Sequence, residues 1–182
     1  MKNGEKLRRA VIITDEGFED EEVMYPIIRL KEEGFQVDIA TKGKKLVLGR
    51  LKFPLELSVR YYGNLVDATN LNTKNYDLVL LPGGFEAPDR VRQIPEVLKF
   101  VKKMYQEKKL VTAFCHGPWI LISAGILKGK KATSYIGIAD DLKNAGAIYT
   151  NDKPVVEDGN IITSRHPRDV GEFMKSILRK FK

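Results

Sequence analysis

The chain of 182 residues is poor in the residues that bind metals or form cross-links: it has a single cysteine, Cys115, and only two histidines. One cysteine cannot form a disulfide within the chain, so nothing in the sequence calls for an oxidising compartment. A structural zinc site of the thiolate type is excluded as well, because it needs several cysteines or a Cys/His cluster. We therefore predict neither a metal nor a cofactor.

Long hydrophobic runs are also missing. The first apolar run, residues 10–14, is too short for a signal peptide, and no run approaches the roughly 20 residues of a membrane-spanning helix. The sequence thus predicts a cytoplasmic protein that has no membrane partner.

Lysine and arginine outnumber the acidic residues, 31 to 24, which gives a net charge of +7. Such an excess is compatible with binding to nucleic acid or other anions. However, the basic residues are spread along the chain, and no aromatic residues interleave a basic cluster as single-strand binders require. The pattern favours a solvated basic surface over a nucleic-acid partner.

Short apolar runs alternate with helical patterns along the chain. Strands are predicted at 10–14, 36–41, 77–82 and 110–114, and helices at 19–34, 95–109, 117–125, 139–146 and 169–181. This alternation is typical of βαβ units, that is, of an α/β protein with a mainly parallel sheet between layers of helices. With no linker, repeat or low-complexity stretch, we predict one domain over residues 1–182.

Two segments break this rhythm. Residues 43–75, which include "KKLVLGRLKFPLELSVRYYG", favour an antiparallel excursion from the sheet. Residues 155–163, "VVEDGNIIT", carry an Asp-Gly turn between apolar runs and predict a β-hairpin.

Polar or flexible stretches follow three of the predicted strands: "DEGFED" after the first, "PGGFEAPDR" after the third and "CHGP" after the fourth. Open α/β sheets bind ligands beyond the carboxyl ends of their strands. The convergence of these stretches predicts the site there.

Cys115 ends an apolar strand and opens a helix, which is the strand–turn–helix context of a nucleophile elbow. A helix N-terminus is expected to lower the pKa of the thiol. The alternative is a small buried apolar side chain, the usual role of a lone cysteine. The adjacent His116 could act as general base and acid, or could merely pack at the turn. His166 is predicted to be a loop residue at the rim of the pocket.

Glu19 lies between the first strand and its helix, where it could face the cysteine and exchange a proton with it. Asp20, Glu21 and Glu22 are interpreted instead as first-turn carboxylates that the helix dipole favours. Gly83 and Gly84 permit unusual dihedral angles and could point backbone N–H groups into the site as an oxyanion hole.

Together these stretches resemble the ThiJ/PfpI family over nearly the whole chain. The similar segments are "DEGFEDEEVMYPIIRLKEEGFQVDIAT", "LVLLPGG", "FCHGPWILISAGILKGKKATSY" and "IITSRHPRD". The resemblance implies a flavodoxin-like three-layer sandwich of the class I glutamine amidotransferase type. It also implies that Glu19 hydrogen-bonds to the sulfur of Cys115 and that N–H groups of Gly84 and His116 line an oxyanion hole.

In PfpI-type members, an acid from a neighbouring subunit completes the cysteine and histidine. The matching position is Asp89, one methylene shorter than the family's usual glutamate, and Glu86 is a weaker second candidate. The resemblance thus implies a homo-oligomer, a dimer or hexamer. Glutamine amidotransferase activity is excluded, because His166 lacks a glutamate two positions later.

Three activities use such a cysteine. We predict a cysteine hydrolase of the PfpI peptidase type, in which His116 deprotonates Cys115 and Asp89 orients the imidazole. The first alternative, which the sequence disfavours only slightly relative to the peptidase, is a glutathione-independent glyoxalase or deglycase that acts on methylglyoxal or its protein adducts. The third is a redox-sensing stress protein or chaperone, in which the thiolate is oxidised to a sulfinate.

Overall fold

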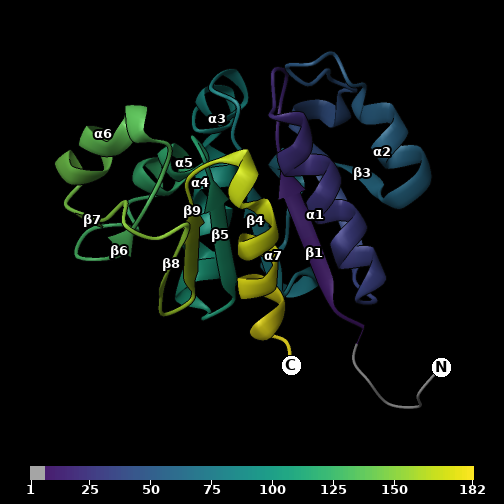
Figure 1. Cartoon of the computed structure of the whole chain (residues 1–182). Coiled ribbons are helices and arrows are strands. Elements are labelled where there is room, and N and C mark those ends of the chain that lie inside the picture. The colour runs from purple at the N-terminus through teal and green to yellow at the C-terminus, as the bar shows by residue number, and fades with distance from the viewer. Residues whose placement is uncertain (1–6) are drawn as a thin grey trace.

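The computed structural model describes residues 7–182, in which a seven-stranded sheet lies between two layers of helices (Figure 1). The strand order is β3-β2-β1-β4-β5-β9-β8, and every neighbouring pair is parallel except β9 and β8. The strands of this sheet are β1 (Arg9–Ile13), β2 (Gln36–Thr41), β3 (Asn64–Asp67), β4 (Leu78–Leu81), β5 (Leu110–Phe114), β8 (Val155–Asp158) and β9 (Ile161–Ser164). The predicted flavodoxin-like α/β fold is confirmed.

The helices connect the strands and cover the sheet. They are α1 (Asp20–Glu32), α2 (Leu55–Tyr62), α3 (Glu86–Val91), α4 (Pro95–Gln106), α5 (Pro118–Ser123), α6 (Ala139–Asn144) and α7 (Val170–Arg179). A separate two-stranded sheet of β6 (Lys131–Ala132) and β7 (Ile148–Tyr149) lies beside α6 at one end of the molecule.

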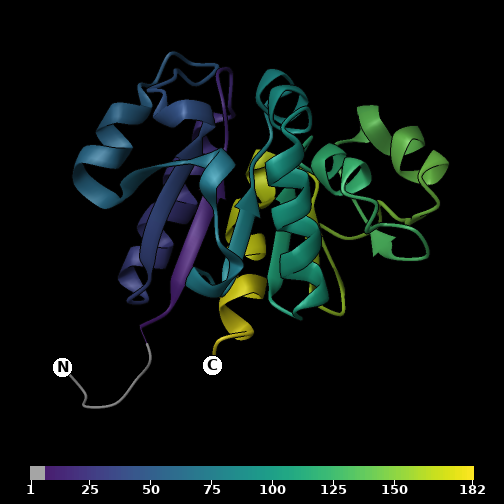
Figure 2. The same ribbon diagram turned by 180° about the vertical axis from the view of Figure 1, so that it is seen from behind.

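The central strands are mostly apolar because both of their faces are buried. In β1, Val11 and Ile13 join one core, while Ala10 and Ile12 join the other. Helices α1 and α7 cover the second core, and α4 and α5 cover the first, as the two opposite views show (Figures 1 and 2). This burial explains why the runs at 10–14 and 110–114 were recognisable as strands.

The predicted antiparallel excursion at 43–75 is wrong. This segment instead forms helix α2 and then β3, which pairs in parallel with β2. Among the described residues of this segment, the one antiparallel pairing is an isolated bridge between Leu48 and Pro54. Helix α2 forms because Leu55 and Ser58, one turn apart, are both buried against the rest of the fold. The hairpin of β8 and β9 is confirmed.

The carboxyl ends of β1, β4, β5 and β9 lie side by side at one edge of the sheet, opposite the C-terminus in Figure 1. The loops that follow these strands therefore meet there. Within residues 7–182, no helix is both long and apolar enough to cross a bilayer.

Candidate active site

Cys115 lies on a sharp turn between β5 and α5. Its φ of +55° is in the left-handed region, which costs a non-glycine residue energy. Two backbone hydrogen bonds hold this conformation: the Cys115 N–H donates to Ser164 O at 3.1 Å, and the Tyr135 N–H donates to Cys115 O at 2.9 Å. The predicted strand–turn–helix context is thus present. Although the side chain is only 6% exposed, it lines a pocket.

Gly83 and Gly84, after β4, bring the backbone close to the cysteine. A Cβ atom on Gly83 would lie 2.6 Å from Cys115 Cβ and 2.8 Å from Glu22 Oε2, so no side chain fits between them. Gly84 has a φ of +75°, and a Cβ there would collide with the backbone oxygen of Gly17. The backbone N–H groups of Gly84 and His116 act on the sulfur of Cys115 and lower the pKa of the thiol. These are the two N–H groups that the resemblance assigns to an oxyanion hole.

The carboxylate closest to the thiol is Glu22, which the sequence interpretation assigned to the solvated first turn of the helix. Glu22 is 0% exposed, its Oε2 accepts a 2.6 Å hydrogen bond from the Gly83 N–H, and its carboxyl group interacts with Cys115. Burial raises the pKa of Glu22 well above its usual range, which favours the protonated form of this carboxyl group. Spacing could have identified it, because Glu22 precedes the buried Pro26 and Leu30 by one and two turns.

Glu19 takes a different position from the one implied by the resemblance. Its Oε2 accepts a 2.6 Å charged hydrogen bond from Arg50 Nη1, and no hydrogen bond from Glu19 to the sulfur is present in the described chain. Arg50 belongs to the loop before α2, which Asp20 fixes by accepting from the N–H groups of Leu51 and Phe53. Glu19 therefore lines the pocket as half of an ion pair, and Glu22 has the place beside the thiol.

His116 faces the cysteine. Its Nδ1 is 3.3 Å from Cys115 Sγ, and its ring stacks on Tyr135 with centroids 4.8 Å apart. Burial lowers the pKa of His116, and the nearby Arg50 cation lowers it further. The imidazole is therefore neutral at pH 7 and can accept the thiol proton.

The expectation of a lowered thiol pKa was wrong because it omitted burial. Burial raises the pKa of Cys115, and a charge on Glu22 would raise it further, while the N–H groups of His116 and Gly84 act in the opposite direction. Because burial favours the protonated form of Glu22, the main opposing influences on the thiol pKa are burial and these donors. The thiol depends on a proton acceptor, and His116 is the one within reach.

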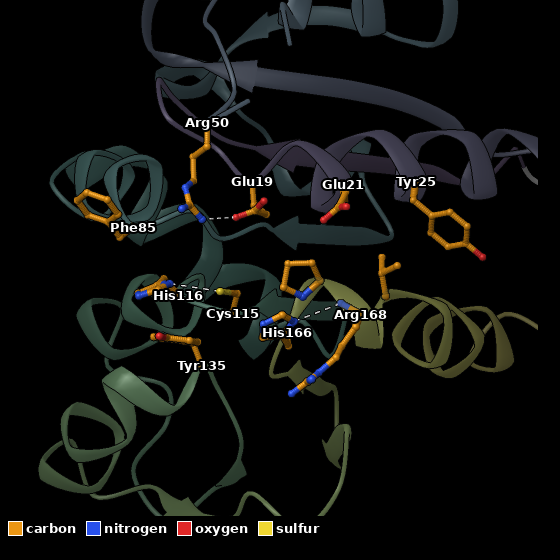
Figure 3. A pocket seen from close by; sticks show the side chains of 12 residues that line it. Glu19, Glu21, Tyr25, Arg50, Phe85, Cys115, His116, Tyr135, His166 and Arg168 are labelled. Carbon is orange, nitrogen blue, oxygen red and sulfur yellow. Dashed lines mark hydrogen bonds and ion pairs between the residues drawn. The ribbon is translucent and has the colours of Figure 1, made fainter. Parts of the chain in front are cut away.

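These groups line a pocket of about 890 Å³ (Figure 3). Cys115 is at its centre, with Phe85, His116 and Tyr135 at one end and Glu21 and Tyr25 of α1 at the other. His166, predicted at the rim, also lines this pocket, together with Arg168. Among the described residues, no three Cys, His, Asp or Glu side chains gather as a metal site.

Asp89 and Glu86 are not brought to the cysteine of their own chain. Both lie on α3 and line a second hollow of about 730 Å³, which shares Phe85 with the first pocket. Asp89 accepts a hydrogen bond from Gln93, and Glu86 pairs with Arg90 at 3.6 Å. Within one chain, the predicted Cys–His–Asp arrangement therefore lacks its acid.

Comparison with known proteins gives consistent results. The sequence model described as "DJ-1/PfpI family" matches residues 8–180. "Deglycase PfpI" of Pyrococcus furiosus is 43% identical over 91% of this chain and 94% of its own, and "Putative cysteine protease YraA" of Bacillus subtilis is 37% identical over 95% and 97%. The crystal structure of DJ-1beta from Drosophila melanogaster superposes with a TM-score of 0.86 at 26% identity, covering 96% of this chain and 90% of that one.

Proposed function

Because this chain belongs to the DJ-1/PfpI family, we propose that it is a Cys115-dependent deglycase, an enzyme that removes methylglyoxal from amines and releases lactate. The observation that carries the proposal is that thiol, proton acceptor and buried acid all come from one chain: Cys115, His116 and Glu22. The name of the Pyrococcus furiosus relative supports the same activity.

The reaction begins with proton transfer from the thiol to His116 Nδ1. The sulfur attacks the carbon that joins the amine to the methylglyoxal unit, the C–N bond breaks, and the amine leaves with the proton held by the imidazolium. The product is a hemithioacetal on Cys115. The N–H groups of Gly84 and His116, which lower the pKa of the thiol, can also stabilise negative charge on the adjacent oxygen.

An internal proton shift then turns the hemithioacetal into a lactoyl thioester. A base removes the hydrogen from the carbon bound to sulfur, and the neighbouring carbonyl carbon gains a proton. The hydroxyl group on the carbon bound to sulfur loses its proton and becomes the thioester carbonyl, while the former carbonyl oxygen gains one and becomes the lactate hydroxyl. Glu19 is suited to this step, because it lines the pocket and its contact with Arg50 fixes its carboxyl group there. Water finally hydrolyses the thioester, which releases lactate and restores the thiol. Free methylglyoxal would enter at the hemithioacetal, which gives the glyoxalase reaction.

The peptidase that the sequence analysis favoured is the second candidate. The 3.3 Å contact between His116 Nδ1 and Cys115 Sγ and the name of the Bacillus subtilis relative support it. It requires Asp89 from another copy of the chain, so we propose a homo-oligomer as its active form. Oxidation of Cys115 in a stress response and a cytoplasmic location stay predictions.

One experiment separates the two. Lactate and free amine are measured after purified protein is mixed with the pre-formed adduct of methylglyoxal and N-acetyl-lysine, and a parallel assay uses free methylglyoxal. We expect turnover that Cys115→Ser abolishes and Asp89→Ala retains. No lactate from the wild type, together with peptide hydrolysis that Asp89→Ala abolishes, would replace the deglycase by the peptidase.

A further inference from the structure

Trp119, the single tryptophan of the chain, lies one turn after the elbow on α5. Its ring packs edge-on against the imidazole of His116, with centroids 5.2 Å apart and an interplanar angle of 62°. Tyr135 contacts the same imidazole by stacking. The proton acceptor of the site is therefore contacted by aromatic rings from two segments.

The tryptophan is itself fixed. Its Nε1–H donates a 2.7 Å hydrogen bond to Asp141 Oδ2 on α6, and the guanidinium carbon of Arg92 lies 5.4 Å from the ring centroid. Arg92 in turn donates from Nε to Ser123 Oγ at the end of α5. A charged acceptor and a cation thus set the orientation of the indole, and neither group lines the pocket that contains Cys115.

The imidazole needs such support. Within residues 7–182, its one hydrogen bond is the 3.3 Å contact with Sγ, which alone does not prevent rotation of the ring. A base must keep hydrogen-bond distance and direction to the proton that it removes. The ring contacts are the remaining constraint on that direction.

We propose that Trp119, anchored by Asp141, is a positioning residue that holds His116 Nδ1 against the sulfur of Cys115. The hydrogen bond between Trp119 of α5 and Asp141 of α6 thereby affects the position of the reacting atoms, although neither residue contacts the substrate. This inference rests on the proposed function only in so far as His116 takes the thiol proton, a step that the deglycase and the peptidase share.

The test uses Asp141→Ala, which removes the acceptor, and Asp141→Asn, whose side-chain oxygen can still accept from the indole. Asp140→Ala is the matched control, because Asp140 is exposed on the same helix and pairs with Lys143. The first readout is the decrease in tryptophan fluorescence at acidic pH, because a protonated His116 beside the indole quenches its emission. The second is alkylation of Cys115 by iodoacetamide, and the third is kcat and KM for the methylglyoxal adduct of N-acetyl-lysine.

We expect Asp141→Ala to lower kcat and the alkylation rate at pH 7 by about 3- to 10-fold, the typical effect of losing one hydrogen bond, with KM unchanged. The decrease in fluorescence at acidic pH should be smaller in this variant, because the rings of His116 and Trp119 move apart. Asp141→Asn should recover most of each loss, and Asp140→Ala should match the wild type. Thermal unfolding of each variant shows whether the fold is intact.

The titration depends on the groups that face these rings: Cys115, Arg50 and Tyr135 around His116, and Asp141 and Arg92 around Trp119. None of these except Asp141 is changed. An Asp141→Ala protein with wild-type quenching and alkylation would overturn the inference, as would equal losses in Asp141→Asn and Asp141→Ala. Because quenching and alkylation need no substrate, failure of the deglycase assay alone leaves the inference standing.

Discussion

Replacing Glu22 by glutamine should change the pKa of the Cys115 thiol by less than about one unit. The reason is that burial raises the pKa of Glu22 well above its usual range, which favours the neutral carboxyl group. Glutamine is a neutral group of the same shape, and its side-chain oxygen can still accept the hydrogen bond from the Gly83 N–H. The substitution therefore replaces one neutral neighbour of the sulfur by another.

If Glu22 were ionised instead, its replacement by glutamine would change the pKa of the Cys115 thiol much more. A Cβ atom on Gly83 would lie 2.8 Å from Glu22 Oε2 and 2.6 Å from Cys115 Cβ, so Glu22 Oε2 is no more than about 5 Å from Cys115 Cβ. At about 5 Å and an effective dielectric constant of about 20, two negative charges repel by about 3 kcal/mol, or roughly 2 pKa units. An ionised Glu22 would hold the thiol pKa up by that amount, and Glu22→Gln would lower it.

The assay is the rate of alkylation by iodoacetamide as a function of pH, followed by the mass of the intact protein. Cys115 is the only cysteine, so the signal has no other source. Glu21→Gln is the matched control, because Glu21 is the neighbouring exposed carboxylate on α1 and lines the pocket. A midpoint that falls by two units or more in Glu22→Gln, but not in Glu21→Gln, would refute a neutral Glu22.

Three further predictions follow from the geometry. Gly83→Ala should abolish turnover and lower the free energy of unfolding by about 1–3 kcal/mol in urea titrations, because its Cβ would overlap Cys115 and Glu22; wild-type activity would contradict the close packing. Arg50→Gln should raise the pKa of His116, since the Arg50 cation lowers it. The acidic limb of the kcat/KM profile should therefore move to higher pH. A limb that stays in place or moves to lower pH would show that Arg50 does not act on His116. Cys115→Gly should be more stable than Cys115→Ala by about 1 kcal/mol in thermal unfolding, because glycine adopts a φ of +55° without strain; equal stability would mean that the elbow is unstrained.

The parts of the fold that were predictable from the sequence are those where burial leaves a simple pattern. Strand β4 and residues 10–13 of β1 are covered on both faces, so each is a continuous apolar run. Residues 43–75 were mistaken for antiparallel strands because their β-branched and aromatic residues resemble a strand locally. Helix α2 instead forms through the burial of Leu55 and Ser58, a tertiary effect that local propensity does not contain.

The active site, too, has residues that were predictable from the sequence and residues that were not. Cys115, His116 and the glycines of the turn after β4 were recognisable because an elbow needs those residue types. The choice between Glu19 and Glu22 was not, because it depends on which side chain faces inward from the first turn of α1. Position in the loop favoured Glu19, whereas the helix turns Glu22 toward the thiol and leaves Glu19 to Arg50.

The two hydrogen bonds that hold the elbow have a consequence for synthesis of the chain. They come from Ser164 and Tyr135, which the ribosome adds well after Cys115. A nascent chain that has passed Cys115 but not β9 therefore lacks the contact that holds the cysteine in its left-handed conformation. The thiol should acquire its native reactivity only after β9 has emerged, so chains that stop before β9 would be poor catalysts.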